Sequence, residues 1–245
     1  SCSFDFSVWE IFGALFSGGS LVIIPYYVRR SFSELYRLLK ESKVSVLSQT
    51  PSVFRQVMAI DSESNYKLTD LRYIIFGGEA LDITMLAPWF EKYTDNEPHL
   101  INMYGITETT VHVTFKEIRR EHLQGINNLI GKPLPDLNIF ILNEAGNLLP
   151  AGFAGEMFVG GDGITRGYLN NPALTAEKFI NHPFLPNEKL YKTGDYGRWL
   201  QNGELQYCGR VDDQVKIRGY RIELNEISHC IRQFPEVAEV IVRVI

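Results

Sequence analysis

The chain has 245 residues, of which 45% are hydrophobic and 22% charged, so it can bury the core of one large domain or two unequal ones. Its formal net charge of -5 at pH 7 excludes a general nucleic-acid-binding protein. Three scattered cysteines (Cys2, Cys208 and Cys230) match neither a metal site nor an even disulfide set, and no signal peptide or long apolar span appears. We therefore expect a cytoplasmic protein that does not bind membranes.

The first 130 residues alternate between predicted helices and predicted strands. Ser7 with Glu10, and Ser31 with Glu34, form capping boxes at two helix starts, and Thr50-Pro51 begins a third helix. A fourth helical segment covers residues 81–93. Strands are predicted at residues 20–24, 44–47, 72–76 and 100–103. This alternation predicts an α/β fold, a parallel sheet with helices on both faces.

Residues at the carboxyl ends of these strands are candidates for one binding site, because parallel sheets bind ligands at that edge. Ser48, Gly77 and Tyr104 each follow a predicted strand. We expect them to lie close together.

Beyond residue 130 the sequence becomes β-rich and glycine-punctuated. Residues 131–135, Gly-Lys-Pro-Leu-Pro, are typical of a linker. Short strands are predicted at residues 138–142, 155–161, 190–199 and 204–208. They predict a small antiparallel sheet or barrel-like subdomain packed on the α/β part. A helix with Leu224, Ile227 and Ile231 on one face, and a terminal strand at 237–245, begin a small α+β unit.

Residues 102–113, Asn-Met-Tyr-Gly-Ile-Thr-Glu-Thr-Thr-Val-His-Val, combine a strand end with groups suited to a nucleotide. Gly105 permits close backbone approach to a ligand, and unpaired N–H groups at such a turn suit an anion. Tyr104 offers a flat ring, Thr107 a hydroxyl for phosphate, and Glu108 a hard oxygen ligand for magnesium. The alternative is a capped strand-to-helix turn with a solvated glutamate.

Asp5 lies among Phe4, Phe6 and Trp9, next to the first predicted helix. It is either an accessory cap or a partner for an ammonium group, since a buried carboxylate needs a counter-charge.

Several motifs, in this order, resemble those of adenylate-forming enzymes: Tyr104 to Glu108, Gly155 to Tyr168, Tyr191 to Asp195, and Gly209 to Gly219. The surroundings of Asp5, and the segment from Gly219 to Glu226, are similar to adenylation domains of nonribosomal peptide synthetases. The resemblance covers essentially the whole chain. It implies that residues 1–130 and 131–211 are the α/β and β-rich parts of the large N-terminal subdomain, and that residues 212–245 start a truncated C-terminal subdomain.

The resemblance further implies ATP-dependent activation of an amino acid, with magnesium, and transfer of the aminoacyl group to the phosphopantetheine thiol of a carrier domain. Tyr104 would stack on adenine with Asn102 at its edge and Gly105 beside it. Gly78 and Glu79 would line the cleft, Thr107 would touch phosphate, and Glu108 would bind magnesium. Asp195 would accept both ribose hydroxyls with Arg210 nearby, and Tyr207 is either a nucleotide contact or core.

Two further residues match the family's moving parts. Asp212 matches the hinge about which the C-terminal subdomain rotates, and Lys216 matches a lysine that enters the site in the second conformation, unless it is a solvated strand lysine. A glycine- and Ser/Thr-rich phosphate loop is expected before residue 1 and a catalytic lysine beyond residue 245. We therefore expect the fragment by itself to be inactive.

The family's substrate-pocket positions can be carried over to Asp5, Phe6, Trp9, Ser48, Ile75, Gly77, Met103, Val111 and His112. This set resembles threonine-activating domains, apart from Ser48, where asparagine is usual. His112 would meet the substrate hydroxyl, unless it is a satisfied core histidine. We predict threonine over valine, with serine as the main competitor. The departure at Ser48 leaves dehydrobutyrine and larger hydroxy amino acids open.

Two other functions stay open on the sequence: a fatty- or aryl-acid coenzyme A ligase of the same superfamily, and a noncatalytic remnant. Asp5 argues against the ligase, because an acid without an amine has no use for a carboxylate there. The expected partners are a peptidyl carrier domain and a condensation domain in the same polypeptide.

Overall fold

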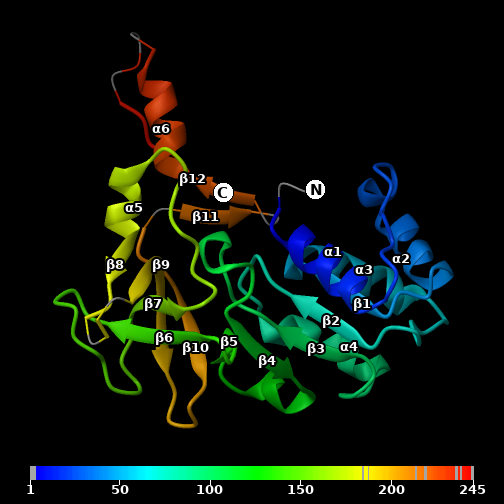
Figure 1. Cartoon of the computed structure of the whole chain (residues 1–245). Coiled ribbons are helices and arrows are strands. Elements are labelled where there is room, and N and C mark those ends of the chain that lie inside the picture. Colours follow the sequence, from blue (N-terminus) through cyan, green and yellow to red (C-terminus); the bar gives the residue numbers. More distant parts are fainter. Residues whose placement is uncertain are drawn as a thin grey trace.

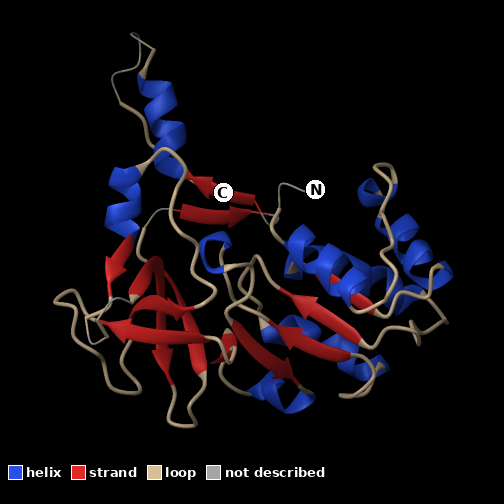
Figure 2. Ribbon diagram, viewed as in Figure 1, coloured by secondary structure: helices blue, strands red, loops and turns tan. Residues whose placement is uncertain are grey.

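A ten-stranded mixed sheet forms the frame of the molecule (Figures 1 and 2). The computed structural model describes residues 4–183, 185–186, 188–212, 214–217, 220–234, 237 and 239–243. The strand order is β1-β2-β3-β4-β5-β10-β9-β7-β6, with β8 paired to β9, and β11 and β12 form a separate two-stranded sheet. In this described part, no helix combines the length and apolar character needed to cross a bilayer.

The parallel part of the sheet carries the main helices. Strands β1 (Val46–Gln49), β2 (Tyr73–Phe76) and β3 (His99–Asn102) run parallel. Half of the predicted capping box at Ser31 is present: Ser31 Oγ accepts the Glu34 N–H at 3.4 Å, whereas the Glu34 carboxylate pairs with Arg37. The helices are α1 (Phe6–Phe16), α2 (Phe32–Glu41), α3 (Pro51–Glu63) and α4 (Ala87–Lys92), with 3-10 turns η1 (Val28–Arg30) and η2 (Ile83–Leu86).

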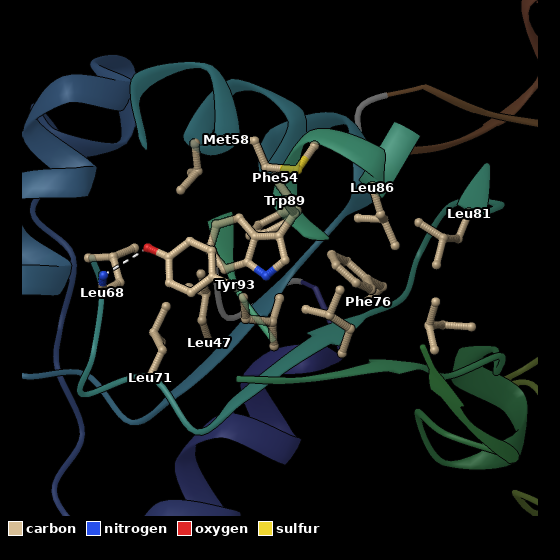
Figure 3. Close-up of a cluster of buried hydrophobic side chains, with 14 of the residues drawn as sticks. Leu47, Phe54, Met58, Leu68, Leu71, Phe76, Leu81, Leu86, Trp89 and Tyr93 are labelled. Atoms are coloured by element: carbon tan, nitrogen blue, oxygen red, sulfur yellow. Dashed lines mark hydrogen bonds between the residues drawn. The ribbon is translucent and has the colours of Figure 1, made fainter. Parts of the chain in front are cut away.

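One apolar core holds α2, α3 and α4 against the sheet. Phe54, Phe76, Leu86 and Trp89 are almost completely buried in it, and burial of side chains of this size is the main source of stability. Figure 3 shows this core between the strands and the helices, with α1 on the opposite side of the strands. The α/β fold with helices on both faces of the parallel strands is therefore confirmed.

An antiparallel region continues the same sheet. It consists of β4 (Thr114–Ile118), β5 (Leu129–Pro133), β6 (Leu137–Leu142), β7 (Gly155–Gly161), β8 (Phe179–Asn181), β9 (Lys189–Trp199) and β10 (Leu205–Arg210). The short elements η4 (Arg120–Gln124) and α5 (Pro172–Lys178) connect these strands. Four of the strands match predicted ones closely, and the described C-terminal part adds β11 (Gln214–Ile217), β12 (Tyr220–Glu223) and the predicted helix α6 (Leu224–Arg232).

The prediction of a linker at residues 131–135 is wrong, because residues 131–133 form the end of strand β5. This strand joins the two regions by pairing with both β4 and β10. Gly131 has a φ of +79°, and a Cβ there would lie 2.0 Å from the Phe115 carbonyl oxygen. The glycine is thus needed for close strand approach rather than for flexibility.

Three other local predictions are also wrong. Residues 20–24 form no strand, because they have no pairing partner among the described residues, and Ile23 is 81% exposed. Helix α1 begins at Phe6 with Asp5 as its N-cap residue, so that Ser7 lies inside the first turn. At the other end, residues 237 and 239–243 are not in a strand.

A buried carboxylate ties α2, α3 and α4 together. Asp61 Oδ1 accepts hydrogen bonds from the hydroxyls of Tyr36 (2.8 Å) and Tyr93 (2.9 Å), and Lys92 Nζ lies 3.0 Å from Oδ2. Tyr93 also accepts the Leu68 N–H at 2.8 Å, as drawn in Figure 3. Burial is the main reason that the pKa of the Tyr36 hydroxyl is raised, and the hydrogen bond to Asp61 and the charge of Asp61 raise it further.

We predict that Asp61→Ala lowers the free energy of unfolding by about 3–5 kcal/mol, because it leaves a half-buried ammonium and two buried hydroxyls without their common partner. Urea unfolding would measure the change. Asp70→Ala, at an exposed position, is the matched control and should change stability by less than about 0.5 kcal/mol. Equal effects of the two substitutions would contradict a structural role for Asp61.

Candidate nucleotide and amino-acid site

The loop after β3 is tightly folded. A Cβ on Gly105 would lie 2.0 Å from the Val111 carbonyl oxygen, so that no other residue fits there without a backbone shift. Thr107–Thr109 form a single 3-10 turn, η3, and Thr110 and Val111 follow with φ of 61° and 70°. Two consecutive left-handed residues, both of them β-branched, are strained. The loop presents a fixed set of side chains.

A cavity opens beside this loop. It has a volume of about 40 Å³ and is lined by Gly78, Glu79, Ala80, Leu81, Asn102, Met103, Tyr104, Gly105, Asn128, Ile130 and Tyr207. Six of these residues were predicted to contact the nucleotide: Gly78, Glu79, Asn102, Tyr104, Gly105 and Tyr207. A larger cavity of about 340 Å³, beside Asp61 and Trp89, contains none of the motif residues. We assign the site to the smaller cavity because motif residues from distant segments converge there.

Two polar residues of this cavity are held by the surrounding fold. Asn102 Nδ2 donates to the Leu129 carbonyl oxygen at 2.7 Å. Glu79 accepts the backbone N–H and the hydroxyl of Ser52, both at 3.0 Å. Because Ser52 lies in the first turn of α3, the Glu79 carboxylate is placed at the positive end of that helix.

Asp195 lies at the centre of a polar cluster that borders the cavity. Its side chain is 2% exposed, and it accepts hydrogen bonds from the Tyr104 hydroxyl at 2.7 Å and from Arg210 Nη1 at 2.9 Å. The Tyr207 hydroxyl lies 3.5 Å from Oδ1. The pKa values of both tyrosine hydroxyls are raised well above the usual range, mainly by burial and secondly by the negative charge of Asp195. They therefore remain neutral donors.

Arg210 connects this cluster to the predicted hinge. Its Nε and Nη2 atoms each donate to one oxygen of Asp212 at 2.7 Å. Burial alone would lower the pKa of Arg210, but Asp212 and Asp195 outweigh it and raise the pKa. For Asp212 the effects have the opposite sign: burial alone would raise the pKa of its carboxyl, but Arg210 outweighs burial and lowers the pKa. The planar guanidinium thus bridges two carboxylates.

Glu108 and Thr107 lie at the other end of the loop. Glu108 is buried, and its Oε1 accepts the Tyr168 hydroxyl at 2.7 Å. Thr107 Oγ1 donates to Asp5 Oδ2 at 2.7 Å, which brings the predicted phosphate contact next to the predicted ammonium partner. Tyr168 belongs to a motif quoted from the sequence, but no role was predicted for it.

The carboxylate of Glu108 can bind magnesium only if phosphate oxygens supply further ligands. Nowhere in the described ranges do three or more His, Cys, Asp or Glu side chains gather into a metal site. Magnesium commonly binds through one or two carboxylates together with substrate phosphates. The residues present therefore fit a magnesium ion that arrives with ATP.

Five of the predicted pocket residues, Phe6, Trp9, Gly77, Met103 and His112, are linked by contacts around three rings. The rings of Phe6 and Trp9 each lie 5.3 Å from that of His112. A Cβ on Gly77 would lie 2.5 Å from the Phe6 ring and 3.3 Å from the Met103 carbonyl oxygen, so glycine makes room for Phe6 there. Ile75 packs in one hydrophobic cluster with Met103, and Ser48 on β1 is the register partner of Ile75 on β2. Val111, which precedes His112 in the sequence, is buried.

His112 has an unmatched polar atom inside this apolar setting. Its Nε2 is buried and, in the described part of the chain, has no hydrogen-bond partner. Burial lowers the pKa of His112 to about 4, against the opposing effect of the Asp5 charge. A neutral imidazole with an unmatched nitrogen can bind a small polar group of a ligand.

Lys216 is the one predicted site residue whose side chain lies outside the described residues. Its backbone pairs with Arg221 in the β11–β12 sheet.

Comparison with known proteins identifies relatives of this arrangement. The family model described as "AMP-binding enzyme" matches residues 1–169. The dimodular nonribosomal peptide synthase of Bacillus subtilis (strain 168) is 50% identical over 249 residues, covering 99% of this chain and 10% of its own length.

Solved structures share the fold. PA1221, an NRPS protein containing adenylation and PCP domains, aligns with a TM-score of 0.86 and 29% identity over 98% of this chain and 48% of its own. The Vibrio cholerae adenylation domain AlmE, in complex with glycyl-adenosine-5'-phosphate, aligns with a TM-score of 0.84 and 29% identity over 96% of this chain and 44% of its own. The chain spans less than half the length of each of these proteins.

The lowered pKa of His112 predicts a loss of stability in acid. The unfolded chain takes up a proton here near pH 6.5, whereas the folded chain does so only near pH 4. The stability conferred by the neutral imidazole is therefore full above pH 6.5 and is lost as the pH falls toward 4. We predict a loss on the order of 2–3 kcal/mol between pH 7.5 and 4.5 that His112→Phe abolishes. The other four histidines are common to both proteins, so parallel urea titrations isolate His112. Identical pH profiles would show that it is not buried as a neutral group.

Proposed function

This chain belongs to the AMP-binding enzyme family of adenylate-forming ligases, and we propose that its protein activates an amino acid with ATP in nonribosomal peptide synthesis. An amino-acid carboxylate oxygen attacks the α-phosphate of ATP, the bond to the β-phosphate breaks, and pyrophosphate leaves with the electron pair. The resulting aminoacyl adenylate is passed to a carrier thiol. The AlmE complex, which holds glycyl-adenosine-5'-phosphate, supports this chemistry by analogy.

The observation that carries the proposal is the buried Asp195 carboxylate beside the Tyr104 cavity. A carboxylate accepts two hydrogen bonds from vicinal hydroxyls, as a ribose presents them. Tyr104 and Tyr207 border the same cavity with aromatic rings that can contact a base. In the proposed complex Asp195 binds the ribose, Arg210 balances its charge, and Asn102, Gly78, Glu79 and Gly105 line the nucleotide cleft.

At the phosphate end, Thr107 and Glu108 are the proposed contacts. Magnesium supplies charge neutralisation of the phosphates when bound, and Glu108 is the carboxylate that would hold it. Thr107 needs to exchange its hydrogen bond to Asp5 for one to phosphate. The ammonium of an amino acid at Asp5 would favour this exchange, because it replaces the hydroxyl as partner of the carboxylate.

We propose threonine as the substrate. Phe6, Trp9, Ile75, Gly77 and Met103 are the proposed, mainly apolar lining of the substrate pocket, and the buried Nε2 of His112 would supply the polar group for a side-chain hydroxyl. Ser48 is a second hydroxyl on the same side of β1 and β2 as Ile75. The half-buried Asp5 carboxylate, whose charge acts on His112 and which bonds to Thr107, offers a partner for an ammonium group that the fatty or aryl acid of the alternative ligase lacks.

The proposed partners are a peptidyl carrier domain with its phosphopantetheine and a condensation domain in the same polypeptide. PA1221, which contains adenylation and PCP domains, supports the carrier. We propose that Asp212 is the hinge and that Lys216 enters the site after rotation. The location in the cytoplasm and the domain boundaries remain predictions from the sequence.

We predict that Glu108→Gln, in the full-length protein, lowers amino-acid-dependent ATP–pyrophosphate exchange by about a hundredfold or more, because one preorganised charge contact is lost. The melting temperature should change little. Glu144→Gln, at an exposed position in the β6–β7 turn, is the matched control. Near-normal exchange by the Glu108 variant at limiting magnesium would rule out the metal-binding assignment.

The second functional prediction concerns selectivity. Exchange across an amino-acid panel should favour threonine over valine and 2-aminobutyrate, because a site that bonds a hydroxyl leaves its own polar group unpaired with the analogue. Serine should be the main competitor, since one methyl is worth only about 1–3 kcal/mol. His112→Ala should reduce the threonine/valine ratio. A preference for valine, or a ratio unchanged in the variant, would contradict the assignment.

A further inference from the structure

Tyr168 contacts the carboxylate to which the proposed function assigns the metal. Its hydroxyl donates to Glu108 Oε1 at 2.7 Å and lies 3.1 Å from the Tyr191 hydroxyl. Tyr168 is 60 residues from Glu108 in the sequence, so the contact depends entirely on the tertiary fold. The family motif that contains Tyr168 has no other assigned chemistry in this chain.

The backbone of Tyr168 is fixed by its neighbours. Its N–H donates to Thr175 Oγ1 at 2.9 Å, and Thr175 lies in α5, which Asn171 caps through the Leu174 N–H at 3.1 Å. Gly167 has a φ of +140°, and a Cβ there would lie 2.4 Å from the Thr175 side chain. Only glycine can bring Tyr168 so close to α5.

The ring of Tyr168 is also restrained. It packs edge-on against Phe179, with ring centroids 5.7 Å apart, and Phe179 in turn packs against Tyr191 at 4.9 Å. Tyr191 is 1% exposed in β9. A ring held by aromatic packing and by a second phenol places its hydroxyl at a defined point.

The main chain around Glu108 is joined to the same segment. The Thr165 N–H donates to the Glu108 carbonyl oxygen at 2.9 Å, and Thr110 Oγ1 donates to the Gly163 carbonyl oxygen at 2.6 Å. Residues 163–168 thus hold both the backbone and the side chain of the η3 turn. This arrangement restricts the direction in which the Glu108 carboxylate points.

We infer that Tyr168, supported by Tyr191, is a positioning residue that orients Glu108 for the magnesium ion bound with ATP. The inference rests on the proposed function. A phenol is a neutral donor, so it fixes the carboxylate without cancelling the charge that a cation requires. Hydrogen-bond partners of metal ligands typically contribute about 10–100-fold to metal affinity.

The test is metal binding rather than turnover. Mn²⁺ titrations of the full-length protein, followed by electron paramagnetic resonance with a non-hydrolysable ATP analogue present, measure the metal affinity directly. Tyr168→Phe should weaken this affinity by about 10–100-fold while retaining the packing against Phe179. Tyr191→Phe should weaken it less, because Tyr191 acts through Tyr168. Tyr66→Phe, at an exposed tyrosine whose ring contacts Lys40, should bind as the wild type does.

A double-mutant cycle separates positioning from general damage. In a Glu108→Gln background, Tyr168→Phe should cause no further loss of Mn²⁺ affinity, since its effect passes through the glutamate. An unchanged affinity in the single Tyr168 variant, or an equal loss in both backgrounds, would overturn the inference and leave the proposed function standing. A wild-type protein without nucleotide-dependent Mn²⁺ binding would overturn both. Melting curves of every variant ensure that affinities are compared between folded proteins.

Discussion

The arrangement of this site depends on burying the carboxylate of Asp195. A buried charge is strongly unfavourable without partners, and here the partners come from separate parts of the chain: Tyr104 from the loop after β3, and Tyr207 and Arg210 from β10. Satisfying one charge therefore fixes the α/β region relative to the antiparallel region. Arg210 extends the same network to Asp212, so that any movement of Asp212 alters an ion pair beside the proposed nucleotide site.

A second acidic residue is restrained in a similar way at the opposite end of the loop. Tyr104 bonds to Asp195, and Glu108 bonds to Tyr168, which contacts Tyr191. Tyr191 and Asp195 both belong to β9, so a single strand supports both ends of the loop. The phenol donors bring no positive charge to either carboxylate. This suits the proposed binding of ribose hydroxyls at one end and of a cation with its phosphates at the other.

The sequence predicted best those features that depend on neighbouring residues. The N-cap at Ser31, the start of α3 at Pro51 and the strand at residues 155–161 follow from local patterns. Residues 20–24 have the composition of a strand but find no partner among the described residues, and residues 131–133 have the composition of a linker but pair on both sides. Pairing is a tertiary property, which explains both errors.

The same distinction applies to the site. The motif resemblance predicted a nucleotide role for six of the eleven residues that line the Tyr104 cavity, because each motif carries its own signature, but it did not point to Ala80, Leu81, Asn128 or Ile130. It could not show that Thr107 bonds to Asp5 over 102 residues, or that Tyr168 bonds to Glu108 over 60. Such contacts depend on how the antiparallel region docks on the parallel one. Nothing in the local sequence of Tyr168 distinguishes a positioning tyrosine from a core tyrosine.

The most direct test of this account is a crystal structure of the full-length protein with AMP. We expect the Asp195 carboxylate to lie within hydrogen-bond distance of both ribose hydroxyls, with the adenine ring against Tyr104 and Arg210 still paired with Asp195. AMP bound elsewhere, or bound with its ribose out of reach of Asp195, would contradict the central claim that this buried carboxylate organises the nucleotide site.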